Sequence, residues 1–292
     1  MLTNFKYIIG ILGLFSTGLM AQDDIIAAEK LLNSGKIEKA RGVFLQYDDV
    51  PVAIEYLGDI ASFNKNWDEA IDHYEKLVDL DPENAMYNFK LGGAMGMKAY
   101  YGSRFEAAFL IGNVKEYLKK AADLDPNHKE ARRALVELYM QIPSVVGGSK
   151  IIAEAYASEL DRINEVDALL ADAYIYKTQE YRDLAKIKYN EAIRSAISKP
   201  ELLSRNYLNY ELGEAAALYE IQLEQGKKLL NNYIDNYGYK DLKSPAWAYL
   251  RLAQIERIQN NQQVALSHIT KSLEIDPNFD KALIEKQKIQ RL

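Results

Sequence analysis

Apolar residues recur along most of the chain at the spacing of helices that bury one side, and the pattern is clearest over residues 51–84. Within this stretch two groups of apolar or small residues each recur every three or four positions, which predicts two amphipathic helices. The polar sequence Asn64-Lys65-Asn66 separates the groups and predicts the turn between the helices. The residues expected on the buried faces are Leu57, Gly58 and Ala61 in the first helix, and Ala70, Tyr74 and Leu77 in the second.

A short phrase that contains Asp-Pro marks the boundary after such a pair of helices. It reads DLDPEN at 79–84, DLDPNH at 123–128 and EIDPNF at 274–279. Aspartate is a good N-cap residue, and proline suits the first position of a helix, where its missing N–H leaves no hydrogen bond unmade. We therefore expect each phrase to end one helix and to start the next, with its aspartate as the N-cap.

The paired helices resemble the tetratricopeptide repeat (TPR), a helix–turn–helix unit of ~34 residues. The resemblance rests on a Leu-Gly or Leu-Ala pair in the first helix, a small residue early in the second, and a closing proline. Two units show this pattern most clearly: one has Leu57-Gly58 with Ala70, and the other has Leu252-Ala253 with Ala265. It implies an all-α fold, an α-solenoid in which about seven TPR-like helical hairpins form a right-handed superhelix. The units are expected at 22–50, 51–84, 85–128, 129–163, 164–201, 202–245 and 246–279, followed by a capping helix at 280–292.

Small residues in the expected first helices would let neighbouring helices approach to ~8–10 Å. A larger side chain at these positions would push the helices apart, and no single unit can bury its own apolar face, so stacking must supply the core. The positions concerned are Gly58, Gly92, Ala171, Gly213 and Ala253.

Unit 85–128 is longer than the ~34-residue norm by about ten residues. Either its helices are extended, or a loop bulges around Tyr101-Gly102-Ser103. Phe105, Ala108 and Phe109 are apolar and stand at helical spacing, so we expect extended helices.

The next unit contains the sequence PSVVGGSK at 143–150. Its first helix, 129–141, must stop before Pro143, because the residue before a proline disfavours helical backbone. The P-loop signature G-x-x-x-x-G-K-[ST] is absent, since Pro143 stands where the first glycine would be and no strand precedes the loop. Two interpretations remain: the glycines serve the turn, or backbone N–H groups at the start of the second helix bind an anion. The candidate anion-binding residues are Gly147, Gly148, Ser149 and Lys150.

In tetratricopeptide repeat proteins the first helices line a concave channel, and the resemblance implies an acidic, aromatic-lined channel here. We expect Glu137 and Asp172 on facing helices with Glu165 nearby, and an extended protein or peptide segment with Lys or Arg and apolar residues as the partner. The basic clamp of the chaperone-adaptor members is not matched, since Glu55 and Asp59 stand at its positions. The candidate groove residues are Glu55, Asp59, Phe89, Arg133, Glu137, Glu165, Asp172, Tyr176, Tyr207, Tyr210 and Trp247.

Composition limits the remaining classes of function. The net charge of −6 argues against a nucleic-acid-binding protein. The absence of cysteine excludes thiol catalysis, cysteine-ligated zinc and disulfides. The three histidines form no H-E-x-x-H motif, and His73 and His268 occupy the same repeat position. We therefore expect no catalytic residues, no metal site and no cofactor.

The first 21 residues have the layout of a secretory signal peptide. Lys6 is followed by an uncharged apolar run, YIIGILGLFSTGLMA at 7–21, and then by acidic residues. A helix of this length would span about 22 Å, short of the ~30 Å core of a bilayer. We expect cleavage after Ala21, an exported protein that is periplasmic or secreted, and a mature superhelix domain over 22–292 without a membrane span. The combination of the long unit 85–128 and the PSVVGGSK loop of the next unit resembles exported bacterial repeat proteins of uncharacterised function.

Three interpretations of function follow. The first is an exported, non-catalytic scaffold that binds protein or peptide segments in the concave groove. The second is a structural component of a cell-envelope assembly that docks through its convex face or its ends. The third is a binder of a small ligand or anion near the 143–150 loop.

Overall fold

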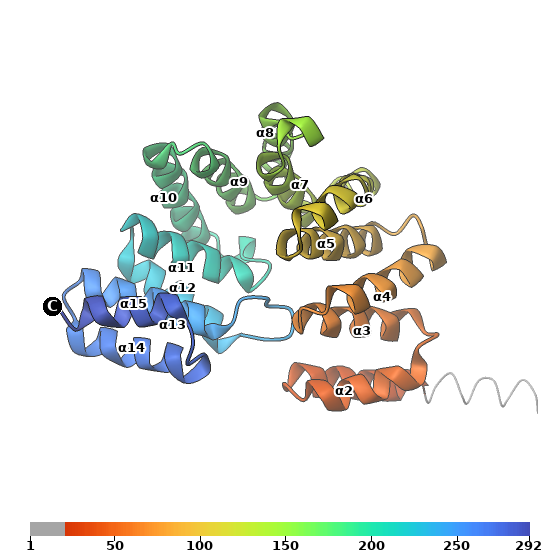
Figure 1. Cartoon of the computed structure of the whole chain (residues 1–292), viewed down its shortest axis with the longest axis horizontal. Coiled ribbons are helices and arrows are strands. Elements are labelled where there is room, and N and C mark those ends of the chain that lie inside the picture. The colour runs from red at the N-terminus through yellow and green to blue at the C-terminus, as the bar shows by residue number, and fades with distance from the viewer. Residues whose placement is uncertain (1–20) are drawn as a thin grey trace, which may run out of the picture.

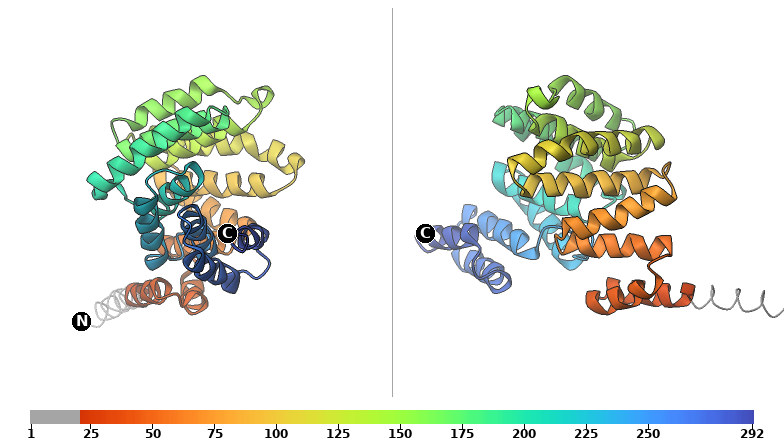
Figure 2. Two further views of the ribbon diagram at one scale, coloured as in Figure 1. Left: turned by 90° about the vertical axis from the view of Figure 1, so that its left-hand side faces the viewer. Right: turned by 45° about the vertical axis from the view of Figure 1, so that its right-hand side comes forward.

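The computed structural model describes residues 21–292, and over these residues the chain forms helices and connecting turns without a strand. The helices pair into seven hairpins that stack into a curved superhelix (Figures 1 and 2). The first hairpin is a helix that ends at residue 33 and α2 (Ile37–Phe44). The others are α3 (Pro51–Phe63) with α4 (Trp67–Leu80), α5 (Ala85–Tyr101) with α6 (Arg104–Leu124), α7 (Lys129–Gln141) with α8 (Lys150–Leu160), α9 (Glu165–Thr178) with α10 (Arg182–Ser198), α11 (Tyr207–Tyr219) with α12 (Leu223–Asp235), and α13 (Pro245–Ile258) with α14 (Gln262–Ile275).

A last helix, α15 (Asp280–Ile289), packs on α13 and α14 and covers the end of the array. Three short 3-10 helices lie in connections: η1 (Leu45–Tyr47), η2 (Ser144–Val146) and η3 (Pro200–Leu202). The predicted α-solenoid of about seven hairpins with a capping helix is therefore confirmed.

The extra length of the third unit lies in its helices, as expected. α5 has 17 residues and α6 has 21, whereas α3 has 13 and α4 has 14. The tip where α5 meets α6 is stabilised by a capping box, in which Ser103 and Glu106 each bind the backbone N–H of the other. The α5–α6 hairpin is therefore longer than the α3–α4 hairpin and has a capped, ordered tip.

The role predicted for aspartate in the Asp-Pro phrases is wrong. α5 begins only at Ala85, so Asp81 and Pro82 lie in the connection, and Asn84 is the N-cap instead. In the second phrase Asp125 Oδ1 accepts a hydrogen bond from the backbone N–H two residues later, at 2.8 Å. Such an Asx turn competes with helix initiation, because the side chain bends the backbone before the next helix can start.

Small residues allow the close helix packing that the sequence predicted. A Cβ atom on Gly58 would lie 2.4 Å from Tyr74 Cε1, and one on Gly213 would lie 2.5 Å from Leu230 Cγ. Both distances are shorter than van der Waals contact, so any larger residue would force the paired helices apart. The other three positions are equally buried or crowded: Gly92, Ala171 and Ala253.

The long connection between α12 and α13, residues 236–244, was not anticipated. It crosses from the sixth hairpin to the first two (Figure 1), where buried Tyr239 packs in one cluster with Leu57 and other apolar residues. Tyr237 adds a tilted ring contact with Phe63, with centroids 6.3 Å apart. The connection therefore links the sixth hairpin to the first two across the interior of the superhelix.

The predicted signal peptide lies outside the described residues, except for Ala21. Within residues 21–292 no helix is both long enough and apolar enough to cross a bilayer.

Candidate functional site

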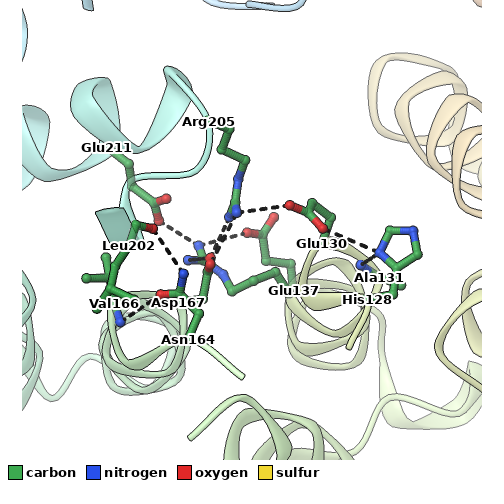
Figure 3. Close-up of polar contacts among 11 residues, drawn as sticks. His128, Glu130, Ala131, Glu137, Asn164, Val166, Asp167, Leu202, Arg205 and Glu211 are labelled. Atoms are coloured by element: carbon green, nitrogen blue, oxygen red, sulfur yellow. Dashed lines mark hydrogen bonds and ion pairs between the residues drawn. The ribbon is translucent and has the colours of Figure 1, made fainter. Parts of the chain in front are cut away.

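Six charged side chains meet on the inner side of the superhelix, where α7 and α9 lie inside α8 and α10 (Figures 1 and 3). We call them the inner network: Glu130, Arg133, Glu137, Asp167, Arg205 and Glu211. Buried Arg133 is at the centre. Its guanidinium lies 2.7 Å from Glu211 Oε1, 3.5 Å from Asp167 Oδ1 and 3.5 Å from Glu137 Oε1. Arg133 therefore joins α7 to α11 across an intervening hairpin.

Arg205 completes the inner network from the connection before α11. Its Nη1 lies 3.3 Å from Glu130 Oε1 and 3.2 Å from Asp167 Oδ2, and Asp167 is fully buried. Asn164 holds these parts in place: its oxygen caps two N–H groups of α9, and its amide donates to the Leu202 carbonyl at 3.0 Å. One cap residue thus positions both the buried carboxylate and the connection that carries Arg205.

The inner network has more negative than positive charge. Four carboxylates face two guanidiniums, so its formal charge is 2 − 4 = −2. Partial removal from water raises the pKa of Glu137 above its ordinary value, and the nearby charge of Glu211 adds to this. The charge of Arg133 acts in the opposite direction. At Glu130 burial also acts to raise the pKa, but the contact with His128 and the charge of Arg205 lower the pKa to about 2. The pKa is therefore raised at Glu137 and lowered at Glu130.

A pocket of about 120 Å³ opens beside the inner network and is here called the tyrosine pocket. Glu137 and Glu211 form part of its wall together with Glu214, and one basic residue, Lys177, also lines it. The rest of the wall is mainly aromatic: Tyr174, Tyr189, Tyr207 and Tyr219. Glu211 Oε2 is buried without a hydrogen-bond partner, whereas the side chain of Glu137 is 43% exposed. Burial raises the pKa of Tyr207 well above its ordinary value, so its hydroxyl stays neutral.

The other carboxylates predicted for the groove have basic partners that the sequence reasoning missed. Lys90 Nζ lies 2.7 Å from Glu55 Oε1 and 2.6 Å from Asp59 Oδ1. Asp172 pairs with Lys188 at 3.1 Å, and Glu165 pairs with Lys199. These pairs offset much of the negative charge expected along the channel, and neither Glu165 nor Asp172 lines the tyrosine pocket.

The predicted aromatic residues also divide into separate places. Tyr207 lines the tyrosine pocket, but Tyr210 is fully buried against Tyr233, with ring centroids 5.3 Å apart, and cannot act as an exposed anchor. Phe89 packs on His128 at 4.8 Å, and Trp247 packs on Phe279 at 4.6 Å. Tyr176 is half-buried against the core of α9 to α12.

The glycines of the 143–150 loop are used for the turn. Gly147 has φ +90°, and a Cβ atom on Gly148 would lie 1.9 Å from the Ile142 carbonyl oxygen. The N–H groups of Gly147, Gly148 and Ser149 donate to carbonyl groups of the protein, Ser149 caps α8, and Lys150 pairs with Glu154 at 3.3 Å. The N–H groups that would have bound an anion at these three residues are therefore already occupied.

Four members of the inner network were absent from the candidate list: Glu130, Asp167, Arg205 and Glu211. They have no motif of their own, and Arg133 and Glu211 stand 78 positions apart.

Within residues 21–292 no group of three or more His, Asp or Glu side chains has an arrangement suited to a metal ion. The arrangement can bind cationic groups, and it presents no activated nucleophile beside a base.

Comparison with known proteins agrees with this architecture. The family model of the tetratricopeptide repeat matches residues 51–84. A search of curated proteins found no significant match. Among solved structures, a tetratricopeptide repeat protein from Parabacteroides merdae is 14% identical with a TM-score of 0.51, and the match covers 92% of this chain and 98% of that one.

Two other structures are similar in fold. A thermophilic TPR protein from Thermus thermophilus is 17% identical with a TM-score of 0.52, over 67% of this chain and 98% of that one. The human IFIT1 dimer with PPP-AAAA is 16% identical with a TM-score of 0.53, over 86% of this chain and 54% of that one. At such identities the likeness shows the fold alone. Residues 51–84 therefore match the tetratricopeptide repeat by sequence, and the superhelix of hairpins has the fold of tetratricopeptide repeat proteins.

Proposed function

We propose that the protein is a non-catalytic scaffold whose tyrosine pocket receives a Lys or Arg side chain from a bound protein or peptide segment. The observation that carries this proposal is the excess of two carboxylates in the inner network, next to a pocket walled by tyrosines. A cation from a partner would neutralise part of this excess where Glu137 remains accessible. Aromatic faces favour the same cation.

The size of the pocket also favours one side chain. Pockets for small molecules usually enclose ~300–1,000 Å³, whereas the tyrosine pocket has about 120 Å³. A segment lying along the inner surface would therefore insert one residue and contact the surroundings with the rest. The raised pKa of Glu137 indicates that its charge destabilises the free protein, as expected of a group that is poised for a cationic partner.

The test is selection of binders from a displayed library of extended peptides. We expect enrichment of peptides with Lys or Arg next to apolar residues. Glu137→Gln should weaken their binding by about tenfold, and it should slightly stabilise the free protein. Glu165→Gln is the matched control, because Glu165 is paired with Lys199 outside the pocket. The proposal fails if the enriched peptides lack basic residues, or if both variants bind them as the wild type does.

We also propose that the protein is exported. Lys6 followed by the apolar run 7–21 supports this. Protein purified from the native host should begin near Gln22. Full-length protein that starts at Met1 in the soluble cytoplasm would contradict export without affecting the binding proposal.

A further inference from the structure

The tip of the α5–α6 hairpin and the connection between α7 and α8 expose an unusual amount of apolar surface. Phe105 is 81% exposed, Phe109 83%, Val145 90% and Ile151 79%. Phe105 and Phe109 are one turn apart on α6, so they share a face of that helix. Single exposed apolar residues are common, but four such exposed residues on two neighbouring hairpins draw attention to this edge as an interaction surface.

The same two segments also form an apolar groove of about 600 Å³, here called the tip groove, whose lining does not include these four exposed residues. The two segments that form it lie at the same edge of the superhelix (Figure 2). Its lining includes Gly96, Ala99, Ala108, Ile111, Ile142 and Val146. The small residues leave room for a partner to approach the helix backbones closely, and the branched residues supply apolar contact.

The tip groove exists because of features that the stacking of repeats does not require. The extended helices α5 and α6 form one wall, and the loop with Gly147 and Gly148 forms the other. Lys115 holds the walls together, since its Nζ donates to the Val146 carbonyl at 3.0 Å. The groove is therefore an ordered surface.

The tip groove has a small excess of positive charge, although the chain as a whole carries −6. Segments 96–115 and 138–152 contain Lys98, Arg104, Lys115 and Lys150 against Glu106, and with the ion-pair partners Asp68 and Glu154 the sum is 4 − 3 = +1. Lys98 and Lys150 have acidic partners, and Glu106 is held in the capping box. Among the described residues Arg104, which lines the groove, and Lys115 form no ion pair.

We propose that the tip groove binds an amphipathic helix of a partner protein that carries Asp or Glu beside its apolar face. The apolar side chains of the helix would enter the groove, as in other helix-in-groove complexes. Its carboxylates would pair with Arg104 and Lys115. A flat bilayer surface would leave the concave groove unfilled, so the shape favours a protein partner. This site is independent of the tyrosine pocket, and together the two would allow the protein to join two partners.

The test uses a displayed library of helical peptides with fixed apolar residues at i, i+3, i+4 and i+7 and random residues elsewhere. We expect the purified protein to enrich peptides with Asp and Glu over Lys and Arg at the random positions. In fluorescence anisotropy, Ala108→Trp should fill the groove and weaken binding at least tenfold. Ala155→Trp is the matched control, because Ala155 is an exposed alanine of α8 outside the groove.

Exchanging the charges of Arg104 and of the peptide distinguishes a loss of recognition from a loss of folding. Arg104→Glu should weaken the acidic peptide about tenfold and should improve binding of the same peptide with its acidic residues changed to Lys. Circular dichroism checks that both variants are folded. The proposal is overturned if enrichment shows no acidic preference, or if the two tryptophan variants bind alike.

Two other outcomes would also overturn it. Sedimentation with vesicles that contain phosphatidylglycerol, lost in Ala108→Trp, would make the tip groove a membrane-binding surface. A dimer in solution that dissociates in Ala108→Trp would make it a contact between copies of this chain.

Discussion

Arg133→Met removes the central cation of the inner network and should destabilise the protein strongly. Arg133 is buried and contacts Glu211, Asp167 and Glu137 at 2.7, 3.5 and 3.5 Å. Breaking a buried ion pair from one side typically costs ~3–5 kcal/mol, because the other charge stays buried without a partner. Asp167 keeps Arg205, and Glu137 keeps access to water. We therefore expect the lower end, about 3 kcal/mol at pH 7.

The measurement is equilibrium unfolding in urea followed by circular dichroism. Lys188→Met is the control, since it breaks the more exposed pair with Asp172 and should cost about 0–1 kcal/mol. Arg133→Met combined with Glu211→Met should recover at least about 1 kcal/mol of the loss, because a carboxylate left without its partner is then removed.

The loss in Arg133→Met should also depend on pH. The pKa of Glu137 is already raised in the folded protein, and removal of Arg133 should raise it further. A group with a raised folded pKa is stabilising once protonated, so the deficit should shrink as the pH falls from 7 towards 5. A deficit below about 1 kcal/mol, or one that does not change with pH, would refute the view that Arg133 neutralises buried carboxylates.

Three further predictions concern other parts of the molecule. Tyr239→Ala should cost about 3 kcal/mol in urea unfolding and increase the radius of gyration in small-angle scattering, because buried Tyr239 links the sixth hairpin to the first two. An unchanged radius would contradict that role. Gly148→Ala should cost more than about 1 kcal/mol, since its Cβ would meet the Ile142 carbonyl; a saturable rise in Tm with phosphate, lost in Lys150→Ala, would instead support an anion site. Glu130→Gln should lower the free energy of unfolding by roughly 2 kcal/mol at pH 7, and this loss should vanish as the pH falls from 4.5 towards 2, where the wild-type carboxylate becomes protonated as well. A loss that persists at low pH would show that packing, not charge, is responsible.

The hairpins could be predicted because the information lies within a few turns of each helix. Ala70, Tyr74 and Leu77 stand at helical spacing, and all three are buried in α4. The aspartate caps were predicted wrongly because two local rules compete at Asp81: N-capping a helix and bending a turn. Propensity alone does not decide between them.

The charge balance of the inner surface could not be predicted in the same way. Lys90 is 31 positions from Asp59, and Arg205 is 75 positions from Glu130. Their pairing depends on the curvature of the superhelix, which brings together residues from different hairpins. The same holds for the 236–244 connection, because its composition does not reveal that it crosses the interior.

The most direct test of the proposed binding site is a double-mutant cycle between the protein and a peptide selected as described above. The cycle combines Glu137→Gln with replacement of the peptide Lys by norleucine, and isothermal titration calorimetry measures the four affinities. If the Lys enters the tyrosine pocket, the coupling energy of the two changes should be about 1 kcal/mol or more. The double change should then weaken binding by less than the sum of the two single changes. Additive effects, with coupling near zero, would show that the basic residue binds elsewhere and would contradict the proposed function.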